Sequence, residues 1–214
     1  MKTGILFDLD GTLLDTLEDL VNGVNHTMTV FGYPQRTKEE VRRFVGNGAR
    51  RLIEQAVPEQ ADVEAALAEF QRYYSAHCQI LTKPYEGILA ALEILSQQYP
   101  IAIVSNKPDT AVKPLCARYF PGIYARGEST DCPRKPAPDM VFKAMESLGV
   151  DRCIYVGDSE VDVLTAENAN VPCISVLWGF RDREEMETVG GQYFCDRPSD
   201  LIPMVERLAE CGNA

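Results

Sequence analysis

Two carboxylates stand two residues apart in the stretch Asp8-Leu9-Asp10-Gly11-Thr12, directly after the apolar run 5–7. In extended backbone, residues i and i+2 project to the same side, so both acids can face one small volume. Two carboxylates at such a short distance repel each other unless a cation or a shared proton reduces the repulsion. A hard divalent ion such as Mg2+ suits oxygen ligands of this kind. The alternative interpretation is a strand followed by an ordinary Asp-Gly turn.

Three further groups of polar residues also lie at or just beyond the end of an apolar segment. In open α/β sheets, ligands bind beyond the carboxyl ends of the strands, so a single site can collect side chains from several strand ends. The three groups are Ser105-Asn106-Lys107 after the run 101–104, Lys135 within the proline-rich loop 134–139, and Asp158 with Asp162 after the run 153–156.

The segment 15–82 has apolar residues at helical spacing, which predicts an all-helical insert without strands. Its last apolar face runs from 63 to 81, so we expect the final helix to reach that far. The candidate helix caps are Asp15 with Glu18 or Thr16 with Asp19 at the start, and then Thr37 with Glu40. We therefore expect a helical cap at 15–82.

From Pro84 onward, short apolar runs alternate with helical patterns, which predicts parallel βαβ units. With the first strand at 4–8, we expect a doubly wound α/β core formed by 1–14 and 83–214. The expected strands lie near 101–105, 123–126, 153–157, 173–177 and 192–194, and the expected helices at 87–98, 109–119, 138–148, 160–169 and 199–210.

The composition excludes several classes of protein. A formal charge of −11 and a pI near 4.7 disfavour nucleic-acid binding, which depends on a basic surface. Seven cysteines without a C-x-x-C pair argue against a zinc site and against a disulfide framework. No stretch approaches a membrane span of roughly 18 apolar residues. Because a strand begins directly after the first residues, there is no room for a signal peptide, and we expect a cytoplasmic protein.

The four polar groups, taken in order, resemble the four motifs of the haloacid dehalogenase-like hydrolases. Within that superfamily, Phe44-Val45-Gly46-Asn47-Gly48 and Ser105-Asn106-Lys107 are typical of the phosphoglycolate phosphatase-like branch. The resemblance spans nearly the whole chain. It implies a Rossmann-like core with an inserted helical cap. It also implies a Mg2+-dependent phosphatase that acts on a small phosphorylated metabolite, with 2-phosphoglycolate as the leading substrate.

The resemblance also implies roles for the motif residues. Asp8 would attack phosphorus and bind Mg2+. Asp10 would protonate the leaving oxygen, later activate water, and give its backbone carbonyl to the metal. Such acid–base help accelerates a reaction by roughly 10²–10⁴-fold. Lys135 would neutralise the charge shared by phosphate and nucleophile, and Asp158 would complete the metal site.

The remaining candidates surround these residues. Ser105 would bond a phosphoryl oxygen, and Asp162 would orient Lys135 or Asp158. The alternative for Asp162 is a structural one, in which the helix dipole stabilises its negative charge in the first turn of the helix. The candidate phosphate- or substrate-binding residues are Thr12, Ser105, Asn106, and, in the cap, Gly48 and Arg50. For Arg50 a solvated helix charge is the alternative, and Lys107 either lines the same loop or is a surface charge.

Other functions fit the same motifs. A phosphotransferase of the β-phosphoglucomutase type would use the same two aspartates but return the phosphoryl group to a sugar. A pyrophosphatase of the same superfamily is a further alternative. A regulatory or binding protein on this fold is the alternative without catalysis, although no motif residue is missing. The oligomeric state stays open.

Overall fold

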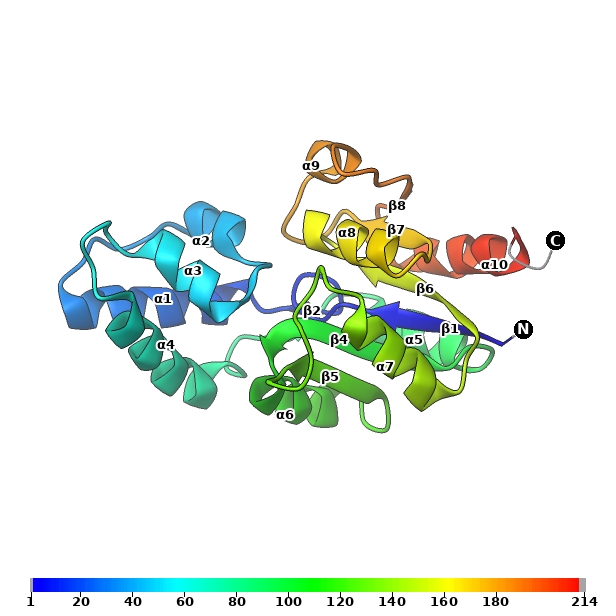
Figure 1. Cartoon of the computed structure of the whole chain (residues 1–214), viewed down its shortest axis with the longest axis horizontal. Coiled ribbons are helices and arrows are strands. Elements are labelled where there is room, and N and C mark those ends of the chain that lie inside the picture. The colour runs from blue at the N-terminus through cyan, green and yellow to red at the C-terminus, as the bar shows by residue number, and fades with distance from the viewer. Residues whose placement is uncertain (1, 212–214) are drawn as a thin grey trace. The chain divides into compact units, whose positions relative to one another are not determined.

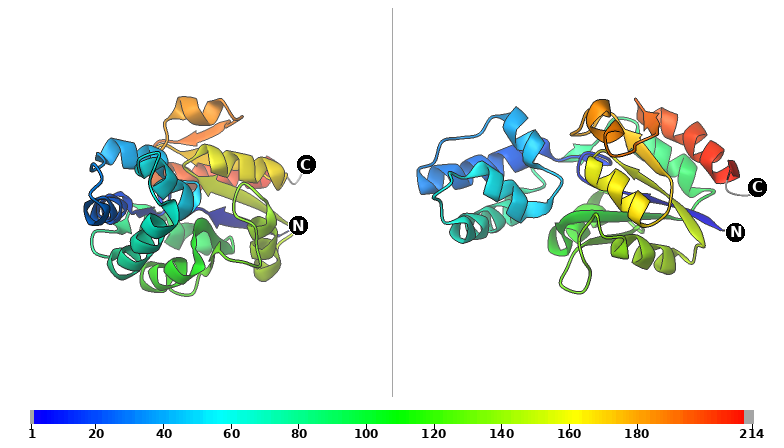
Figure 2. Two further views of the ribbon diagram at one scale, coloured as in Figure 1. Left: turned by 60° about the vertical axis from the view of Figure 1, so that its left-hand side comes forward. Right: turned by 45° about the horizontal axis from the view of Figure 1, so that its top comes forward.

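The computed structural model describes residues 2–211, and the chain divides into two compact units. One unit combines the residues up to Leu14 with those from Pro84 onward, and Asp15–Lys83 form the other. The first unit holds a parallel sheet with helices, and the second holds helices (Figures 1 and 2). We refer to them as the core and the cap.

The core is built on a six-stranded parallel sheet with strand order β5-β4-β1-β6-β7-β8. Its first strand, β1, is central, because Ile5 pairs with Ile101 on one side and with Ile154 on the other. This order confirms a doubly wound α/β fold. The strands are β1 (Thr3–Phe7), β4 (Ile101–Pro108), β5 (Tyr124–Glu128), β6 (Arg152–Gly157), β7 (Cys173–Val176) and β8 (Tyr193–Cys195).

Helices cover both faces of this sheet because successive side chains of each strand point to opposite faces. Ile5 and Phe7 pack into one apolar cluster with α5 (Ile88–Ser96), α6 (Asp109–Tyr119) and α10 (Leu201–Cys211). Leu6, between them, packs into the other cluster with α7 (Asp139–Leu148) and α8 (Glu160–Asn168). Each fully buried Leu, Ile or Phe contributes roughly 1.5–3 kcal/mol. The sheet is therefore a rigid support for the residues at its strand ends.

One short helix of the core, α9 (Arg183–Glu187), lies outside the expected helices. A capping box of Asp182 and Glu185 starts α9. This helix has five residues, too few for an apolar period to stand out in the sequence. The 3-10 turn η1 (Pro198–Asp200) overlaps the start of the helix expected at 199–210 and precedes α10.

The cap consists of four helices, α1 (Leu17–Phe31), α2 (Lys38–Phe44), α3 (Gly48–Ala56) and α4 (Val63–His77). Its interior is apolar, with Met28, Ile53 and Phe70 almost completely buried. The capping box predicted for Thr37 and Glu40 is confirmed at the start of α2, where each side chain accepts from the other residue's backbone N–H. This reciprocal bonding fixes the entry into α2.

The cap departs from the sequence prediction at its ends. Thr16 precedes α1 but makes no side-chain capping bond, and Asp19 accepts bonds from the segment 80–82 instead of capping its own helix. Helix α4 ends at His77, four residues earlier than predicted, and the N–H groups of 80–82 bond to Asp19. A contact spanning 61 residues has no local signature.

The chain passes between the two units through two short strands. They are β2 (Leu14–Asp15) and β3 (Lys83–Pro84), which pair with each other. The expectation of no strand within 15–82 is therefore wrong at Asp15. Two residues of extended backbone are too short to show a period of two in the sequence.

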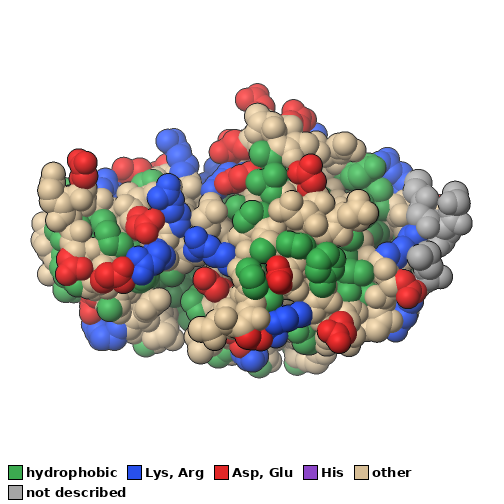
Figure 3. All heavy atoms as spheres, in the orientation of Figure 1, with side chains coloured by type: hydrophobic (Ala, Val, Ile, Leu, Met, Phe, Trp, Pro, Cys, Tyr) green, Lys and Arg blue, Asp and Glu red, His purple; other side chains and the backbone are tan. Residues whose placement is uncertain are grey.

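The helix lengths and the distribution of surface charge are as follows. None of the helices described between residues 2 and 211 combines the length and the apolar character needed to cross a membrane. On the face shown in Figure 3, acidic and basic side chains are interspersed, and the basic ones do not gather into one patch.

Candidate active site

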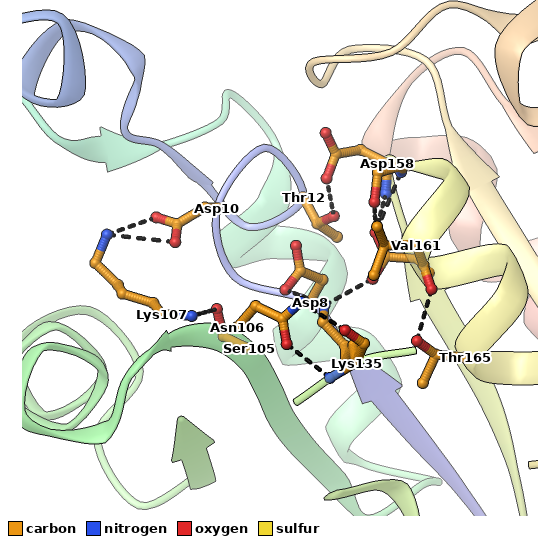
Figure 4. Close-up of polar contacts among 12 residues, drawn as sticks. Asp8, Asp10, Thr12, Ser105, Asn106, Lys107, Lys135, Asp158, Val161 and Thr165 are labelled. Atoms are coloured by element: carbon orange, nitrogen blue, oxygen red, sulfur yellow. Dashed lines mark hydrogen bonds and ion pairs between the residues drawn. The ribbon is translucent and has the colours of Figure 1, made fainter. Parts of the chain in front are cut away.

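The candidate site lies at the carboxyl ends of the three central strands. Asp8 follows β1 directly, and its backbone N–H donates to Val156 on β6 at 2.8 Å. Asp8 is 7 % exposed. Its carboxylate accepts a hydrogen bond from the Lys135 ammonium, with Oδ1 and Nζ 2.7 Å apart (Figure 4). The first acid of the sequence motif is therefore buried and ion-paired.

Lys135 is held in place through its backbone as well as its side chain. It lies in the loop between β5 and α7, where its N–H donates to Oδ1 of Asn106 at 2.7 Å. The Asn106 amide in turn donates to the Lys135 carbonyl at 3.0 Å. Asn106, predicted to bind phosphate or substrate, is thus placed where it anchors the loop of Lys135 (Figure 4).

Asp162 is the second carboxylate on Lys135, with Oδ1 and Nζ 2.7 Å apart. The hydroxyl of Tyr155 also donates to Oδ1, at 3.2 Å. Oδ2 accepts from the backbone N–H groups of Asp158 and Ser159 and from the Ser159 hydroxyl. Five donors leave this carboxylate little capacity for a further ligand. Asp162 touches both residues that the sequence predicted it to orient.

Asp158 follows β6 and is almost completely buried. Its Oδ1 accepts from the Thr12 hydroxyl at 3.0 Å, and its Oδ2 accepts from the Phe180 N–H at 2.7 Å. Thr12, predicted as a phosphate- or substrate-binding residue, therefore has its hydroxyl on a carboxylate.

Two glycines enclose Asp158. A Cβ built on Gly11 would lie 2.3 Å from Asp158 Oδ2, and one built on Gly179 would lie 2.3 Å from Asp158 Cβ. Gly11 also has φ +88°, a conformation that L residues rarely adopt. Any larger residue at these two positions would displace the carboxylate.

The charges of the site do not balance. The carboxylates of Asp8, Asp158 and Asp162 lie close together, and the Lys135 ammonium pairs with those of Asp8 and Asp162. Burial lowers the pKa of Lys135, but the charges of Asp162 and Asp8 outweigh it and raise that pKa well above its ordinary value. Burial and the negative charges of Asp162 and Asp158 raise the pKa of Asp8 well above its ordinary value, although the positive charge of Lys135 lowers it. Burial and the charge of Asp162 raise the pKa of Asp158 to about 7.

This excess of negative charge fits a divalent cation. One oxygen each of Asp8, Asp158 and Asp162 lies within 4.8 Å of the others. Hard cations such as Mg2+ take carboxylate and carbonyl oxygens, and a cation here would relieve the repulsion that raises the pKa of Asp158. Because Asp162 already accepts from five donors, Asp8 and Asp158 are the carboxylates better suited to hold the ion.

Asp10 lies apart from that cluster. Both of its carboxylate oxygens accept from the Lys107 ammonium, at 3.0 and 3.3 Å. Figure 4 shows this pair on the opposite side of the turn from Thr12 and Asp158. Ser105, predicted to bond a phosphoryl oxygen, is buried near it, and its hydroxyl oxygen accepts from the Lys107 N–H at 3.2 Å.

The two predicted cap residues belong to the other unit. Gly48 begins α3 with φ +80°. The Arg50 guanidinium forms ion pairs with Glu64 at 2.7 Å and with Glu54 at 3.9 Å, both within the cap. These contacts match the solvated helix charge that the sequence left open as the alternative for Arg50.

Several residues of the site carried no clear signal in the sequence. The Tyr155 hydroxyl lies on a buried strand, where an aromatic residue is expected for packing alone. The Phe180 N–H lies in a loop, and the role of a backbone N–H does not depend on the residue type. Trp178 donates from its indole to the Thr12 carbonyl at 3.0 Å, which fixes the turn after β1. Only the Trp178-Gly179-Phe180-Arg181 segment after a strand could have pointed to this loop.

The chain is similar over most of its length to proteins named as phosphatases. The family model of haloacid dehalogenase-like hydrolases matches residues 5–176. Phosphoglycolate phosphatase of Agrobacterium fabrum is 38 % identical over 98 % of this chain and 95 % of its own. N-acetylmuramic acid 6-phosphate phosphatase of Pseudomonas aeruginosa is 31 % identical over 97 % of this chain and 96 % of its own.

A solved structure is similar to this chain in fold as well as in sequence. The crystal structure of a candidate phosphoglycolate phosphatase from Lactobacillus delbrueckii subsp. bulgaricus superposes with a TM-score of 0.90 at 36 % identity. The match covers 96 % of this chain and 99 % of that one. The likeness therefore includes both the segment of the cap and that of the core.

Proposed function

The chain belongs to the haloacid dehalogenase-like hydrolases, in their phosphoglycolate phosphatase-like branch, and from this premise we propose a specific reaction. The protein is a Mg2+-dependent phosphatase that hydrolyses a small phosphate monoester through an aspartyl-phosphate on Asp8. The observation that carries the proposal is the ion pair of Asp8 with Lys135 inside a cluster of three carboxylates.

In the first half of the reaction, an oxygen of Asp8 attacks phosphorus and the bond from phosphorus to the ester oxygen breaks. The Lys135 ammonium, 2.7 Å from Asp8, neutralises charge on the nucleophile and on the bound phosphoryl group. Asp10 gives a proton to the leaving oxygen. Positioned acid–base groups of this kind contribute roughly 10²–10⁴-fold to the rate.

In the second half, Asp10 takes a proton from water, and the water oxygen attacks the phosphorus of the acyl phosphate. Phosphate leaves, and the carboxylate of Asp8 is restored. Asp162 keeps Lys135 and the N-terminus of α8 in place throughout, because it bonds to both. The Ser105 hydroxyl, within β4, is proposed to donate to a phosphoryl oxygen.

Mg2+ would be held by Asp8, Asp158 and the backbone carbonyl of Asp10. When bound, the ion supplies positive charge that offsets the charge of the phosphoryl group and of the carboxylates. The Thr12 hydroxyl and the Phe180 N–H orient Asp158 for this role. The raised pKa of Asp158 supports the proposal, because a carboxylate without a cation resists ionisation there.

The proposed substrate is 2-phosphoglycolate, because a relative that matches nearly the whole chain is named phosphoglycolate phosphatase. A second relative is named for N-acetylmuramic acid 6-phosphate, which is also the phosphate ester of an acid. A carboxylate on the substrate is therefore the shared chemistry. Arg50 is a proposed partner for it, although the substrate would have to compete with Glu64 for the guanidinium. Gly48, at the start of α3, would offer its N–H.

Phosphate release from a panel of phosphate esters and one phosphoanhydride tests the proposal. The panel contains 2-phosphoglycolate, N-acetylmuramic acid 6-phosphate, the glucose phosphates and pyrophosphate, each with Mg2+ and with EDTA. We expect release that requires Mg2+ and is fastest from 2-phosphoglycolate. Conversion of β-glucose 1-phosphate to glucose 6-phosphate without release would favour the phosphotransferase. Asp8→Asn is the control for contaminating phosphatases.

A further inference from the structure

The two acids of the first motif have different cationic partners. Asp8 pairs with Lys135, whereas Asp10 pairs with Lys107 through both carboxylate oxygens. The side chains of Lys107 and Asp10 are 4 % and 14 % exposed. Removing charges from water is unfavourable, and the attraction between the ions offsets this cost only when the partners are well aligned. The two-oxygen contact of Lys107 meets this condition, so the pair is a fixed part of the core.

The backbone of Lys107 is fixed on both sides. Its N–H donates to the Ser105 hydroxyl oxygen, two residues earlier on β4. On β5, Gly127 approaches so closely that a Cβ built on it would lie 2.5 Å from the Lys107 carbonyl oxygen. Asp109 holds the same glycine by accepting from its N–H at 3.0 Å. The ammonium therefore extends from a well-defined point of the sheet.

The pair separates Asp10 from the other acids. Among the described residues, the carboxylates close enough to share one ion are those of Asp8, Asp158 and Asp162, and Asp10 is not in that group. Figure 4 shows the Asp10 side chain turned toward Lys107 and away from Asp158. A carboxylate that bound the metal could not exchange protons freely with a leaving group. The position of Asp10 thus determines which chemistry it can perform.

We propose that Lys107 is a positioning residue for Asp10. Its ammonium holds the Asp10 carboxylate outside the metal-binding cluster, on the side where the leaving group departs and water enters. This inference rests on the proposed function, since the leaving group is that of a phosphate monoester. Lys107 thereby supports proton transfer in both halves of the reaction without itself touching phosphorus.

The kinetic test compares leaving groups that need a proton with one that does not. Lys107→Met should lower kcat for 2-phosphoglycolate about 100-fold, within the range of lost acid–base help, with KM changed less than twofold. With 4-nitrophenyl phosphate, the initial burst of nitrophenolate should keep its rate, because nitrophenolate leaves without a proton. The later steady state should still slow, because water activation needs Asp10.

Two further variants make the test specific. Lys107→Arg keeps a cation near Asp10 and should recover at least a tenth of the original kcat. In an Asp10→Asn background, Lys107→Met should cause no additional loss, because residues that act as a unit are not additive. Lys113→Met, which removes an exposed lysine paired with Asp109, is the matched control and should leave kcat unchanged.

Three kinetic results would overturn the inference. They are an equal loss in the burst and the steady state, a multiplicative loss in the double variant, and a rise in KM confined to substrates with a carboxylate. The last result would make Lys107 a substrate-binding residue.

A crystal structure of Lys107→Met tests the inference without turnover. The Asp10 carboxylate should leave its position, and an unchanged position would overturn the inference. Absence of phosphatase activity in the unaltered enzyme would instead refute the proposed function.

Discussion

Core and cap each contain a buried carboxylate, but the two are stabilised in opposite ways. Asp19 of the cap accepts from the N–H groups of Ile80, Leu81 and Thr82 and from the Thr82 hydroxyl, at 2.8–3.1 Å. Asp158 of the core accepts from two donors and lies beside further acids, and its pKa is raised to about 7. The first carboxylate is satisfied by bonds within the cap, whereas the second is one that we propose as a metal ligand.

The largest expected effect separates chemistry from stability. Asp8→Asn should lower kcat at least 1,000-fold, because an amide is a poor nucleophile. The melting temperature should stay the same or rise, since the substitution removes one of three clustered acids. Steady-state kinetics and thermal unfolding of the metal-free protein check this. More than a few per cent of residual activity would contradict the assignment of Asp8.

The corresponding change in the cap should have the reverse outcome. Asp19→Ala leaves buried N–H groups without their acceptor, so the free energy of unfolding should fall by about 3 kcal/mol. Glu18→Ala, one residue earlier, removes only an exposed ion pair with Lys38 and should change stability by less than about 1 kcal/mol. Denaturant unfolding measures both. Equal effects would show that Asp19 is not the structural carboxylate described here.

Glycine substitutions extend the comparison to metal binding. Gly179→Ala places a Cβ 2.3 Å from Asp158 Cβ, so we expect the Mg2+ dissociation constant to rise about tenfold. Gly32→Ala, in the cap, has open space around it but φ +67°. It should cost about 1 kcal/mol of stability and leave Mg2+ affinity unchanged. Titration calorimetry decides between these outcomes, and unchanged Mg2+ affinity in Gly179→Ala would contradict the packing argument.

The two units should also respond oppositely to pH. Between pH 3.8 and about 7, folded Asp158 keeps a proton that the unfolded chain has lost, so its contribution to stability falls as pH rises. Bonds from Arg72 and His26 lower the pKa of Glu69 in the cap to about 2. Its contribution is present above pH 4.5 and is lost as pH falls toward 2.

Denaturant unfolding in EDTA at a series of pH values measures both contributions. Asp158→Asn should flatten the dependence above pH 4, and Glu69→Gln should flatten it below. Mg2+ should offset the loss near neutral pH, because it binds the folded state. A pH dependence that Asp158→Asn leaves unchanged would contradict the described environment of Asp158.

Parts of the fold and of the candidate site could be predicted from local patterns in the sequence. Strands β1, β4, β6 and β7 were predictable, because buried parallel strands are largely continuous apolar runs such as 101–104. Asp8, Lys135, Asp158 and Asp162 were predicted as one site, because parallel strands end at one edge. Their individual roles remain predictions.

Long-range contacts could not be predicted in this way. The bonds of Asp19 to residues 80–82 shorten α4, and the pairing of Lys107 with Asp10 spans 97 residues. The Phe180 N–H that holds Asp158 leaves no mark on the identity of residue 180. Such contacts depend on tertiary structure, and local patterns in the sequence do not encode them.

The most direct test of the central claim is to find the phosphoryl group during turnover. The enzyme is mixed with Mg2+ and its best substrate, quenched in acid within milliseconds, and analysed by peptide mass spectrometry. We predict phosphate on Asp8 of the peptide that contains Asp8 and Asp10, and none in the Asp8→Asn variant. Phosphate on another residue, or turnover without any phosphorylated enzyme, would contradict the account.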